Sequence, residues 1–423
     1  MVSVAEQLAA NLTFSALAKS KELKKRIWFT LGALLVYRVG TYIPLPGIDP
    51  AVWDQIFRSQ AGGFLGMFNG GGIHRMAIFA LNVTPYISAS IFIQLIAKVS
   101  PTLQQLKNEG EWGPVMNQYT RYLTVVLAAF QAYGIAIGLE SVSNVVSDPG
   151  WFFRISTVFT LTGGAVLMMW LAEQVTSCGI GKGVQLILFT GIIAQVLSAI
   201  PGMFELDPGV VLSVGLILVG EVGLIVFMER AHRRLLIHTS GGHSHLSLKL
   251  NTVAELPPIF AASLLLLPTT VANFNEFEGP TLFAPGRPLF LLTYVALIVF
   301  FTFFYTARSY NVTEVADNLK KEGSFIPRIS PGERTAEYID YVLTRITVVG
   351  AAYLAAVCVI PEILISYTAF PFYLGGTDLF VAVSVPMSMI VQIHGLLAPR
   401  KGLLAPRNRT RARSGLKAPV DKS

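Results

Sequence analysis

Residues 289–307 read LFLLTYVALIVFFTFFYTA, a run of nineteen residues without a single charged side chain. A stretch of that length, wound as an α-helix, crosses the roughly 30 Å hydrocarbon layer of a membrane. No water is present at that depth, so only helices and closed barrels satisfy their backbone groups, and an apolar run without two-residue alternation favours the helix. This stretch therefore predicts a membrane-spanning helix.

The rest of the chain repeats this pattern. Of its 423 residues, 53% are hydrophobic and only 13% are charged, whereas a soluble domain carries roughly 25% charged residues. Apolar stretches of spanning length begin near ten positions: Ile27, Met76, Tyr122, Phe152, Val184, Val210, Pro257, Leu289, Tyr341 and Phe372. We therefore predict an all-α membrane protein with ten transmembrane helices.

Successive connections between the spans lie on alternate sides of the membrane. Lysine and arginine are concentrated on one of these two sides. That side holds the segment before the first span, 1–26, the connections 229–251 and 309–340, and the tail, 395–423. By the positive-inside rule both termini are predicted to be cytosolic. The first span follows no signal-type cleavage site, so we expect it to be retained. The other side is acidic, through Asp49, Asp54, Glu140, Asp148, Glu205, Asp207, Glu276, Glu278, Glu362 and Asp378.

Two basic connections, 229–251 and 309–340, are longer than a simple link requires. We interpret them as candidate docking surfaces, although membrane topology alone also explains the formal charge of +7. The tail from residue 395 is rich in Arg, Lys and Ser and is predicted to be a flexible basic segment near anionic lipid.

Ionisable residues are scarce within the predicted spans. Arg38, Glu173, Glu221 and Glu255 are the main examples, and the two glutamates at 173 and 255 are expected near cytosolic helix ends. Placing a charge in hydrocarbon costs at least a few kcal/mol. Charged residues within the spans of ion-coupled transporters therefore usually serve transport itself. We interpret Arg38 as a side chain that reaches the interface or pairs with a neighbouring helix. The pattern disfavours an inverted-repeat secondary transporter, which we retain as an alternative.

Motifs for enzymatic chemistry are weak. The loop 179–183, GIGKG, lacks the Walker spacing and follows a membrane helix, so we reject nucleotide binding there. Four histidines fall in one connection: His232, His238, His243 and His245. They could ligate a metal, but we prefer a solvated, flexible loop. Cys178 and Cys358 are far apart and suggest neither a disulfide nor zinc. We predict no enzyme and no cofactor.

Glycine marks two further features. Residues 60–75, QAGGFLGMFNGGGIHR, are too short and too interrupted to span. Their apolar residues and glycine hinges suit a segment that folds back into the bundle, and an ordinary external loop is the alternative. Small residues in the predicted fourth and fifth helices permit close helix packing: Gly163, Gly164, Ala165 and Gly191.

Several short motifs resemble bacterial members of the SecY family. They are 80–91 (ALNVTPYISASI), 118–122 (QYTRY), 179–183 (GIGKG), 257–261 (PPIFA), 316–321 (ADNLKK), 331–335 (PGERT) and 371–377 (PFYLGGT). Each motif alone is weak. Because they occur in order between about residue 10 and about residue 395, together they make the resemblance specific.

The resemblance implies two five-helix halves related by an inverted repeat, 27–205 and 206–394, around a pore. A lateral gate would lie between the second and third and the seventh and eighth helices. Unfolded polypeptide would cross a ring of aliphatic side chains, and apolar segments would leave sideways into lipid. The residues that match ring positions are Val83, Ile87, Leu188, Ile192, Ile259 and Pro386. The plug that closes the empty pore, at about 60–75, would comprise Gly62, Gly63, Phe64, Leu65, Gly66, Met67, Phe68, Asn69, Gly70, Gly71 and Gly72.

The resemblance also implies partners. The chain would work in the bacterial inner membrane with SecE and SecG, and would receive signal sequences and nascent polypeptides. Because the chain has no nucleotide motif, the SecA ATPase or a translating ribosome would drive translocation. The residues that we expect to dock these partners are Arg233, Arg234, Lys249, Lys320, Lys321, Arg328 and Arg334.

Departures from the family pattern concentrate on the predicted cytosolic side. Residues 113–116 (GPVM) replace a usual Arg-Arg-Lys, and 176–178 (TSC) replace Thr-Glu-Arg. Ser330 stands where the family has a partner-contacting Arg, with Arg328 two places earlier. Pro386 removes a hydrogen bond from the tenth helix. A translocon-like scaffold with impaired motor docking is therefore a second alternative.

Overall fold

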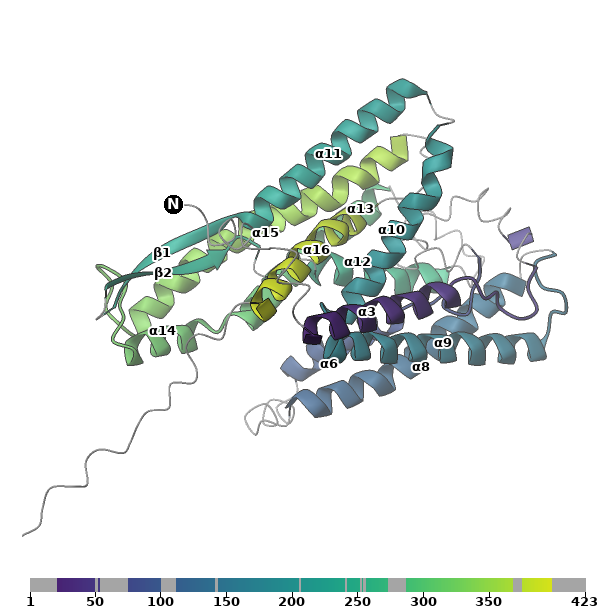
Figure 1. Cartoon of the computed structure of the whole chain (residues 1–423), viewed down its shortest axis with the longest axis horizontal. Coiled ribbons are helices and arrows are strands. Elements are labelled where there is room, and N and C mark those ends of the chain that lie inside the picture. Colours follow the sequence, from purple (N-terminus) through teal and green to yellow (C-terminus); the bar gives the residue numbers. More distant parts are fainter. Residues whose placement is uncertain are drawn as a thin grey trace, which may run out of the picture.

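The computed structural model describes residues 21–49, 52–53, 75–99, 112–140, 144–204, 207–239, 242–251, 253, 256–272, 287–367 and 375–397. They form a helical bundle with a β-hairpin at one end (Figure 1). The helices are α3 (Lys21–Gly40), α6 (Thr84–Val99), α8 (Trp112–Glu140), α9 (Trp151–Cys178), α10 (Gly183–Met203), α11 (Pro208–Arg230), α12 (Leu256–Ala272), α13 (Pro288–Ser309), α14 (Val312–Lys321), α15 (Glu333–Tyr367) and α16 (Gly376–Leu397). The strands are β1 (His232–Thr239) and β2 (Gly242–Lys249). Each predicted span overlaps one helix, although the second helix begins at Thr84 and not near Met76, and α14 is additional.

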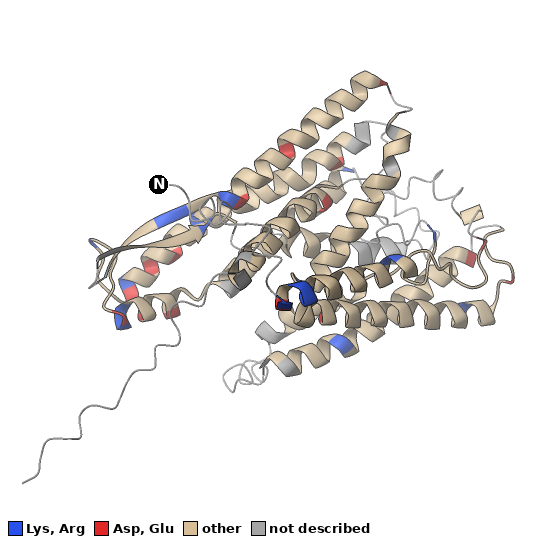
Figure 2. Ribbon diagram, viewed as in Figure 1, with Lys and Arg blue, Asp and Glu red and all other residues tan. Residues whose placement is uncertain are grey.

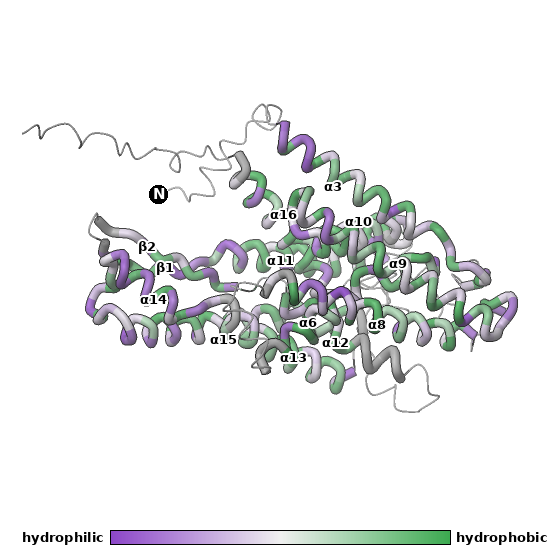
Figure 3. The backbone as a smooth tube through the Cα atoms, turned by 90° about the horizontal axis from the view of Figure 1, so that it is seen from below, coloured by the Kyte–Doolittle hydropathy of each residue, from purple (hydrophilic) through white to green (hydrophobic). Residues whose placement is uncertain are grey.

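Most of these helices have the length and apolar composition of a membrane span. Seven of them, α8, α9, α10, α11, α13, α15 and α16, are long and apolar enough to cross one by length and composition. The helices α6 and α12 are shorter, at 16 and 17 residues, and pack against each other inside the bundle. Helix α3 begins with the charged sequence KELKKR before its apolar part. Figure 3 shows the contrast between the apolar long helices and the hydrophilic α14. The predicted helical membrane fold is confirmed.

Several helices begin away from their apolar stretch. Helix α8 starts at Trp112 instead of near Tyr122, and α15 starts at Glu333 instead of near Tyr341. The first turns of α15 are polar but bury Ile339 against other elements, so the helix continues beyond the lipid. Hydropathy therefore located the spans but not the helix ends, because a helix that leaves the membrane keeps its backbone hydrogen bonds.

The two long basic connections fold together into what we call the lobe, residues 232–250 and 310–346. Strands β1 and β2 pair antiparallel, and α14 packs on α15. The amide of His238 donates to the carbonyl of Phe325 at 2.9 Å, and the amide of Phe325 donates back at 2.9 Å. The side chains that form the lobe core are Leu235, Ile237, Leu248, Ile326, Ile339, Val342 and Ile346.

The predicted flexible histidine loop is therefore wrong, because residues 232–249 form a β-hairpin. Its strands alternate in a two-residue period, with Leu235 and Ile237 on β1 and Leu248 on β2 directed into the lobe core. Within the described residues, no group of three His, Cys, Asp or Glu side chains is placed to hold a metal ion. The hairpin is also the exception to the all-α prediction.

Some predictions lie outside the described residues. These are the plug at 62–72, Glu255, the N-terminal segment before residue 21 and the basic tail from residue 398. The boundaries of the two halves, 27–205 and 206–394, also stay predictions.

A buried isoleucine tests whether the lobe is one packed unit. Ile339 is fully buried in the lobe core, so Ile339→Ala should destabilise the lobe by about 2–5 kcal/mol. Trypsin should then cut faster at Arg233 and Arg234, which strand pairing protects in the native protein. The control is Thr344→Ala, at an exposed position of the same helix. Equal cleavage rates for the two variants would show that the hairpin does not depend on this core.

Candidate functional site

Five of the six residues that match ring positions lie in one buried apolar cluster. Val83 comes just before α6, and Ile87 lies in its first turn. Leu188 and Ile192 are one turn apart on α10, and Ile259 lies in the first turn of α12. All five are at most 4% exposed, and all belong to the largest cluster of buried side chains. The fold thus brings together residues from three distant parts of the chain.

The sixth ring position lies on α16. Pro386 is half-buried there, and the neighbouring Val385 and the preceding Val381 are buried members of the same cluster. Proline has no amide hydrogen, so it cannot donate to the carbonyl of Ala382 in the preceding turn. The family resemblance identified only Pro386 on this helix. Val381 and Val385 are four residues apart and so lie on one face of α16, the face that packs into the apolar cluster, and this spacing is the sequence signal for it.

The chain that leads into α6 is held firmly in place. Residues 75–83 run as a series of turns before the helix begins. The amide of Leu45 donates to the carbonyl of Met76 at 2.8 Å, and the amide of Ile78 donates to the carbonyl of Ile43 at 3.0 Å. Val83 therefore enters the apolar cluster from a segment that is fixed to the end of α3.

Helix α9 packs directly against this segment through a glycine. A Cβ atom on Gly164 would overlap the carbonyl oxygen of Ile78, whereas one on Gly163 would meet nothing within 4 Å. The prediction of close packing is therefore confirmed at Gly164, while Gly163 faces open space. Ala165 and Gly191 are buried.

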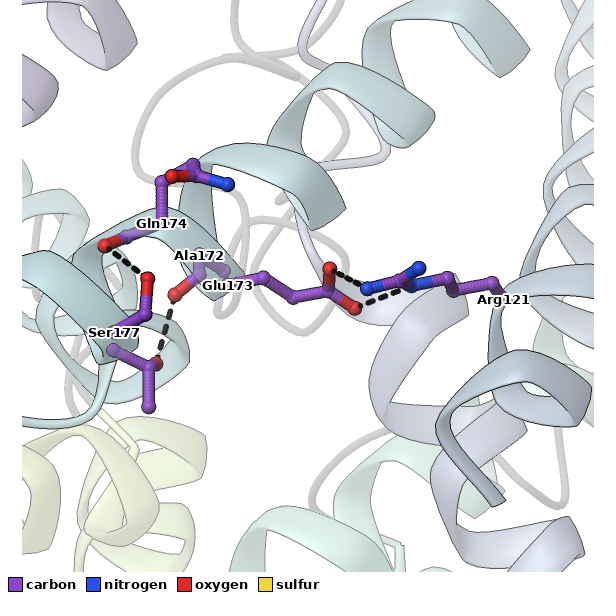
Figure 4. A network of polar contacts seen from close by, with 6 residues as sticks. Arg121, Ala172, Glu173, Gln174 and Ser177 are labelled. Carbon is purple, nitrogen blue, oxygen red and sulfur yellow. Dashed lines mark hydrogen bonds and ion pairs between the residues drawn. The ribbon is translucent and has the colours of Figure 1, made fainter. Parts of the chain in front are cut away.

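An ion pair joins α8 to α9 near the lobe side of the bundle (Figure 4). The guanidinium of Arg121 donates to the two carboxylate oxygens of Glu173 at 2.9 and 2.6 Å. One turn further along α9, the hydroxyl of Ser177 donates to the carbonyl of Gln174 at 3.1 Å. The expected place of Glu173 near a helix end is confirmed. Its bidentate pairing orients α8 against α9, although Arg121 is half exposed and such pairs contribute only about 0–1 kcal/mol.

The glycine-rich loop 179–183 is held by side chains from three helices. Its backbone amides donate to Thr30 Oγ1 on α3 at 3.0 Å, to Gln392 Oε1 on α16 at 2.6 Å and to Thr176 Oγ1 on α9 at 2.8 Å. The loop therefore links the first helices of the chain to the last one. Sequence reasoning treated this motif as a rejected phosphate site and as part of the family resemblance, but missed its structural role.

Two of the acidic residues assigned to the side opposite the basic connections are buried. Glu362 lies near the end of α15, and Asp378 lies in the first turn of α16. Close by in the same region, the hydroxyls of Tyr294 and Thr377 form a hydrogen bond of 2.5 Å. The helix dipole favours a negative charge in the first turn of α16, whereas the nearly complete burial of Asp378 opposes one.

All seven residues that were predicted to dock partners lie exposed on the lobe: Arg233, Arg234, Lys249, Lys320, Lys321, Arg328 and Arg334. Figure 2 shows Lys and Arg gathered at this end of the molecule. Partial burial, followed by the positive charges of Lys249 and Arg234, holds the pKa of His232 below its ordinary value. The hairpin thus presents a positively charged surface.

Arg328 occupies an unusual place on this surface. Its φ angle of 68° lies in the left-handed region, which costs a residue with a side chain about 1–2 kcal/mol. The turn is anchored on both sides of it, by the pairing of Phe325 with His238 and by a hydrogen bond of 2.9 Å from Thr335 Oγ1 to the carbonyl of Ser330. The charge of Arg328 is therefore displayed at a defined position.

Comparison with known proteins agrees with this arrangement. The sequence profile of the SecY family matches residues 77–390, which is most of the chain. The chain belongs to the SecY family. A protein translocase subunit SecY from Rickettsia conorii is 46% identical over 410 residues, covering 90% of this chain and 95% of the relative. The SecY subunit of Escherichia coli K12 is 43% identical over 409 residues, covering 89% and 92%.

Solved structures show the same fold. A protein-conducting channel matches with a TM-score of 0.67 at 14% identity, covering 92% of this chain and 96% of that one. Sec61 from a canine ribosome–channel complex matches with a TM-score of 0.63, also at 14% identity, with coverage of 92% and 96%. The fold is thus that of ten transmembrane helices in two halves. As a SecY-family member, the chain is a channel subunit of a protein translocase, which decides against the secondary transporter.

The glycine pair on α9 offers a matched test of the packing beside the ring. Gly164→Ala should push residues 75–83 away from α9 and lower the stability by about 1–3 kcal/mol, because the added methyl group meets backbone that cannot move easily. Gly163→Ala should leave the stability unchanged or raise it, since alanine favours the helix. Thermal unfolding of the purified protein in detergent measures both. Equal melting temperatures would contradict this account of α9.

Proposed function

We propose that unfolded polypeptide crosses the membrane through the apolar cluster at the centre of this SecY-family channel. The constriction would be formed by the ring residues, with Pro386 and its neighbour Val385 on α16. One observation carries the proposal: five ring residues from three distant elements are buried together in a single apolar cluster. In the closed state these side chains pack against one another, and in the conducting state they would pack around the passing chain.

Apolar side chains suit this task for a physical reason. A hydrophobic constriction excludes water and so blocks ions. Dispersion contacts have no directional requirement, so the constriction can close around a chain of any sequence without binding it tightly. The ring would therefore conduct polypeptide while limiting leakage.

We place the lateral gate between α6 with α8 and α12 with α13. The short helices α6 and α12 pack against each other across the boundary between the two predicted halves, 27–205 and 206–394. If these helices separated, an apolar segment of the passing chain would reach lipid and remain there by favourable transfer free energy. The plug at 62–72 would close the empty pore from the side opposite the lobe.

We assign the lobe side to the cytosol, with both termini there, and the chain to the bacterial inner membrane. Support comes from the bias of Lys and Arg toward that side, where the lobe and the basic tail lie. No catalytic step is assigned to the chain, so energy would come from partners. Those partners would be the SecA ATPase or a translating ribosome, with SecE and SecG completing the channel.

The lobe is the proposed docking surface for these partners. Its exposed cations lie on a folded unit, so they are presented at fixed positions to acidic side chains or ribosomal RNA phosphates. Canine Sec61, which shares the fold, occurs in a ribosome–channel complex. In the alternative of a scaffold with impaired docking, the ring would be intact but no chain would enter it.

Polar substitutions in the ring test the proposal. Ile87→Asn and Ile192→Asn should weaken the apolar seal, so that the channel opens for secretory proteins with defective signal sequences. Export of a reporter with such a signal should rise several-fold in cells that depend on this chain. The control is Ile193→Asn on α10, next to Ile192 but exposed on the outside of the bundle. If all three variants reject the defective signal as strictly as the native chain, the ring assignment is wrong.

A further inference from the structure

A hydrogen bond joins the end of α16 to the glycine-rich loop 179–183, which belongs to the other predicted half. The amide of Gly181 donates to Oε1 of Gln392 at 2.6 Å. Gly181 also lets α16 approach closely, because a Cβ atom at this position would lie 3.4 Å from Cγ of Met389, three residues before Gln392. The φ angle of Gly181 is 84°, a conformation that favours glycine. One end of α16 is therefore attached to the first half of the chain at a defined point.

The loop itself is a fixed platform for this bond. Besides the amide hydrogen bonds described above, Nη1 of Arg26 on α3 donates to the carbonyl of Gly179 at 3.3 Å. On the side of α9, a Cβ atom on Gly183 would overlap the carbonyl oxygen of Ala172. Because α3 and α9 hold the loop from two sides, its bond to α16 fixes the position of α16 against the first half.

The bond also sets a register between α10 and α16. The two helices are in contact (Figure 1), and they are antiparallel, because α10 starts at the loop and α16 runs toward it. Seven and eleven residues are close to two and three helical turns, so side chains that far from Gly181 and from Gln392 lie on the faces that carry the bond and at about the same depth. The pairs at these two depths are Leu188 with Val385, and Ile192 with Val381. All four side chains are buried in the apolar cluster.

Apolar contact alone would not determine this register. Both helices present a nonpolar side chain every four residues: Val184, Leu188, Ile192 and Val196 on α10, and Val381, Val385 and Met389 on α16. A slide by one turn would bring similar side chains together, and dispersion contacts have no directional requirement. Pro386 adds freedom, because its missing backbone hydrogen bond weakens the connection between the two parts of α16. A directional hydrogen bond beyond the proline distinguishes the native register from a shifted one.

We propose that Gln392 is a positioning residue of the channel, whose hydrogen bond with Gly181 sets the height of α16 against α10 and so aligns the ring. Val385 would then meet Leu188 in the constriction, with the next pair one turn deeper. The inference rests on the proposed function, because a constriction of apolar side chains closes only where its members lie at one depth. Gln392 is exposed and acts through the position of α16.

Crosslinking between introduced cysteines measures the register in native membranes. In a background with Cys178→Ser, Leu188→Cys is combined with Val385→Cys to report the native register. Leu188→Cys is combined with Val381→Cys or with Met389→Cys to report a shift of one turn in either direction. The Leu188→Cys variant without a second introduced cysteine gives the background. The ratio of native to shifted crosslinks is then compared among variants of the anchoring glutamine.

Gln392→Leu keeps the size of the side chain and removes the acceptor. It should lower the ratio of native to shifted crosslinks by about fivefold, which corresponds to about 1 kcal/mol. Gln392→Glu should restore the ratio, because a carboxylate oxygen can accept from the amide of Gly181. The matched control is Gln118→Leu on α8, an exposed glutamine whose side chain donates to Tyr122 of the same helix, and it should leave the ratio unchanged.

Export of the reporter with a defective signal sequence is measured with Gln392→Leu alone. A lower crosslink ratio together with higher export would support both the positioning role and the ring. A lower ratio with export as strict as in the native chain would support the register and show that the ring assignment of the proposed function is wrong. If Gln392→Leu leaves the ratio unchanged, or if Gln118→Leu lowers it equally, the positioning role of Gln392 is refuted.

Discussion

The constraint on which this structure depends is that hydrocarbon offers peptide groups no hydrogen-bond partner. Each span must therefore be a helix, and each irregular segment at depth must be held by the protein. Residues 75–83 illustrate the second requirement, because their turns are bonded to the end of α3 and covered by α9 at Gly164. The loop 179–183 illustrates it again at the other end, where side chains from α3, α9 and α16 receive its amides.

The same constraint explains why the conducting part of the molecule resembles an ordinary core. A ring that seals by apolar contact must be made of the side chains that also stabilise the fold. Val83, Ile87 and Ile192 are thus indistinguishable by burial from their neighbours in the cluster. What separates the ring residues is position, since Val83, Ile87, Leu188 and Ile192 come from the first predicted half, whereas Ile259 and Pro386 come from the second. Separation of the helices of the two halves would expose an apolar passage without breaking hydrogen bonds within any helix.

Much of the fold could be predicted from the sequence because lipid imposes a strong compositional signal. The ten spans follow from apolar length, and Glu173 was correctly expected near a helix end. The ring could be named only through family motifs, since buried valine and isoleucine carry no chemical signature. The hairpin at 232–249 was missed because its glycine and histidine residues outweighed the alternation of Leu235 and Ile237. The burial of Asp378 could not be foreseen, because it depends on the packing of the first turn of α16, which hydropathy does not describe.

Crosslinking of a stalled secretory chain tests the central claim most directly. Single cysteines at Ile87 and Ile192, in a background with Cys178→Ser, would be compared with a cysteine at Leu35 on the outer surface of α3; native Cys358 is buried. If polypeptide crosses through the apolar cluster, the stalled chain crosslinks at positions 87 and 192 and not at position 35. A chain that spans the membrane yet crosslinks no better at 87 and 192 than at 35 would contradict the account.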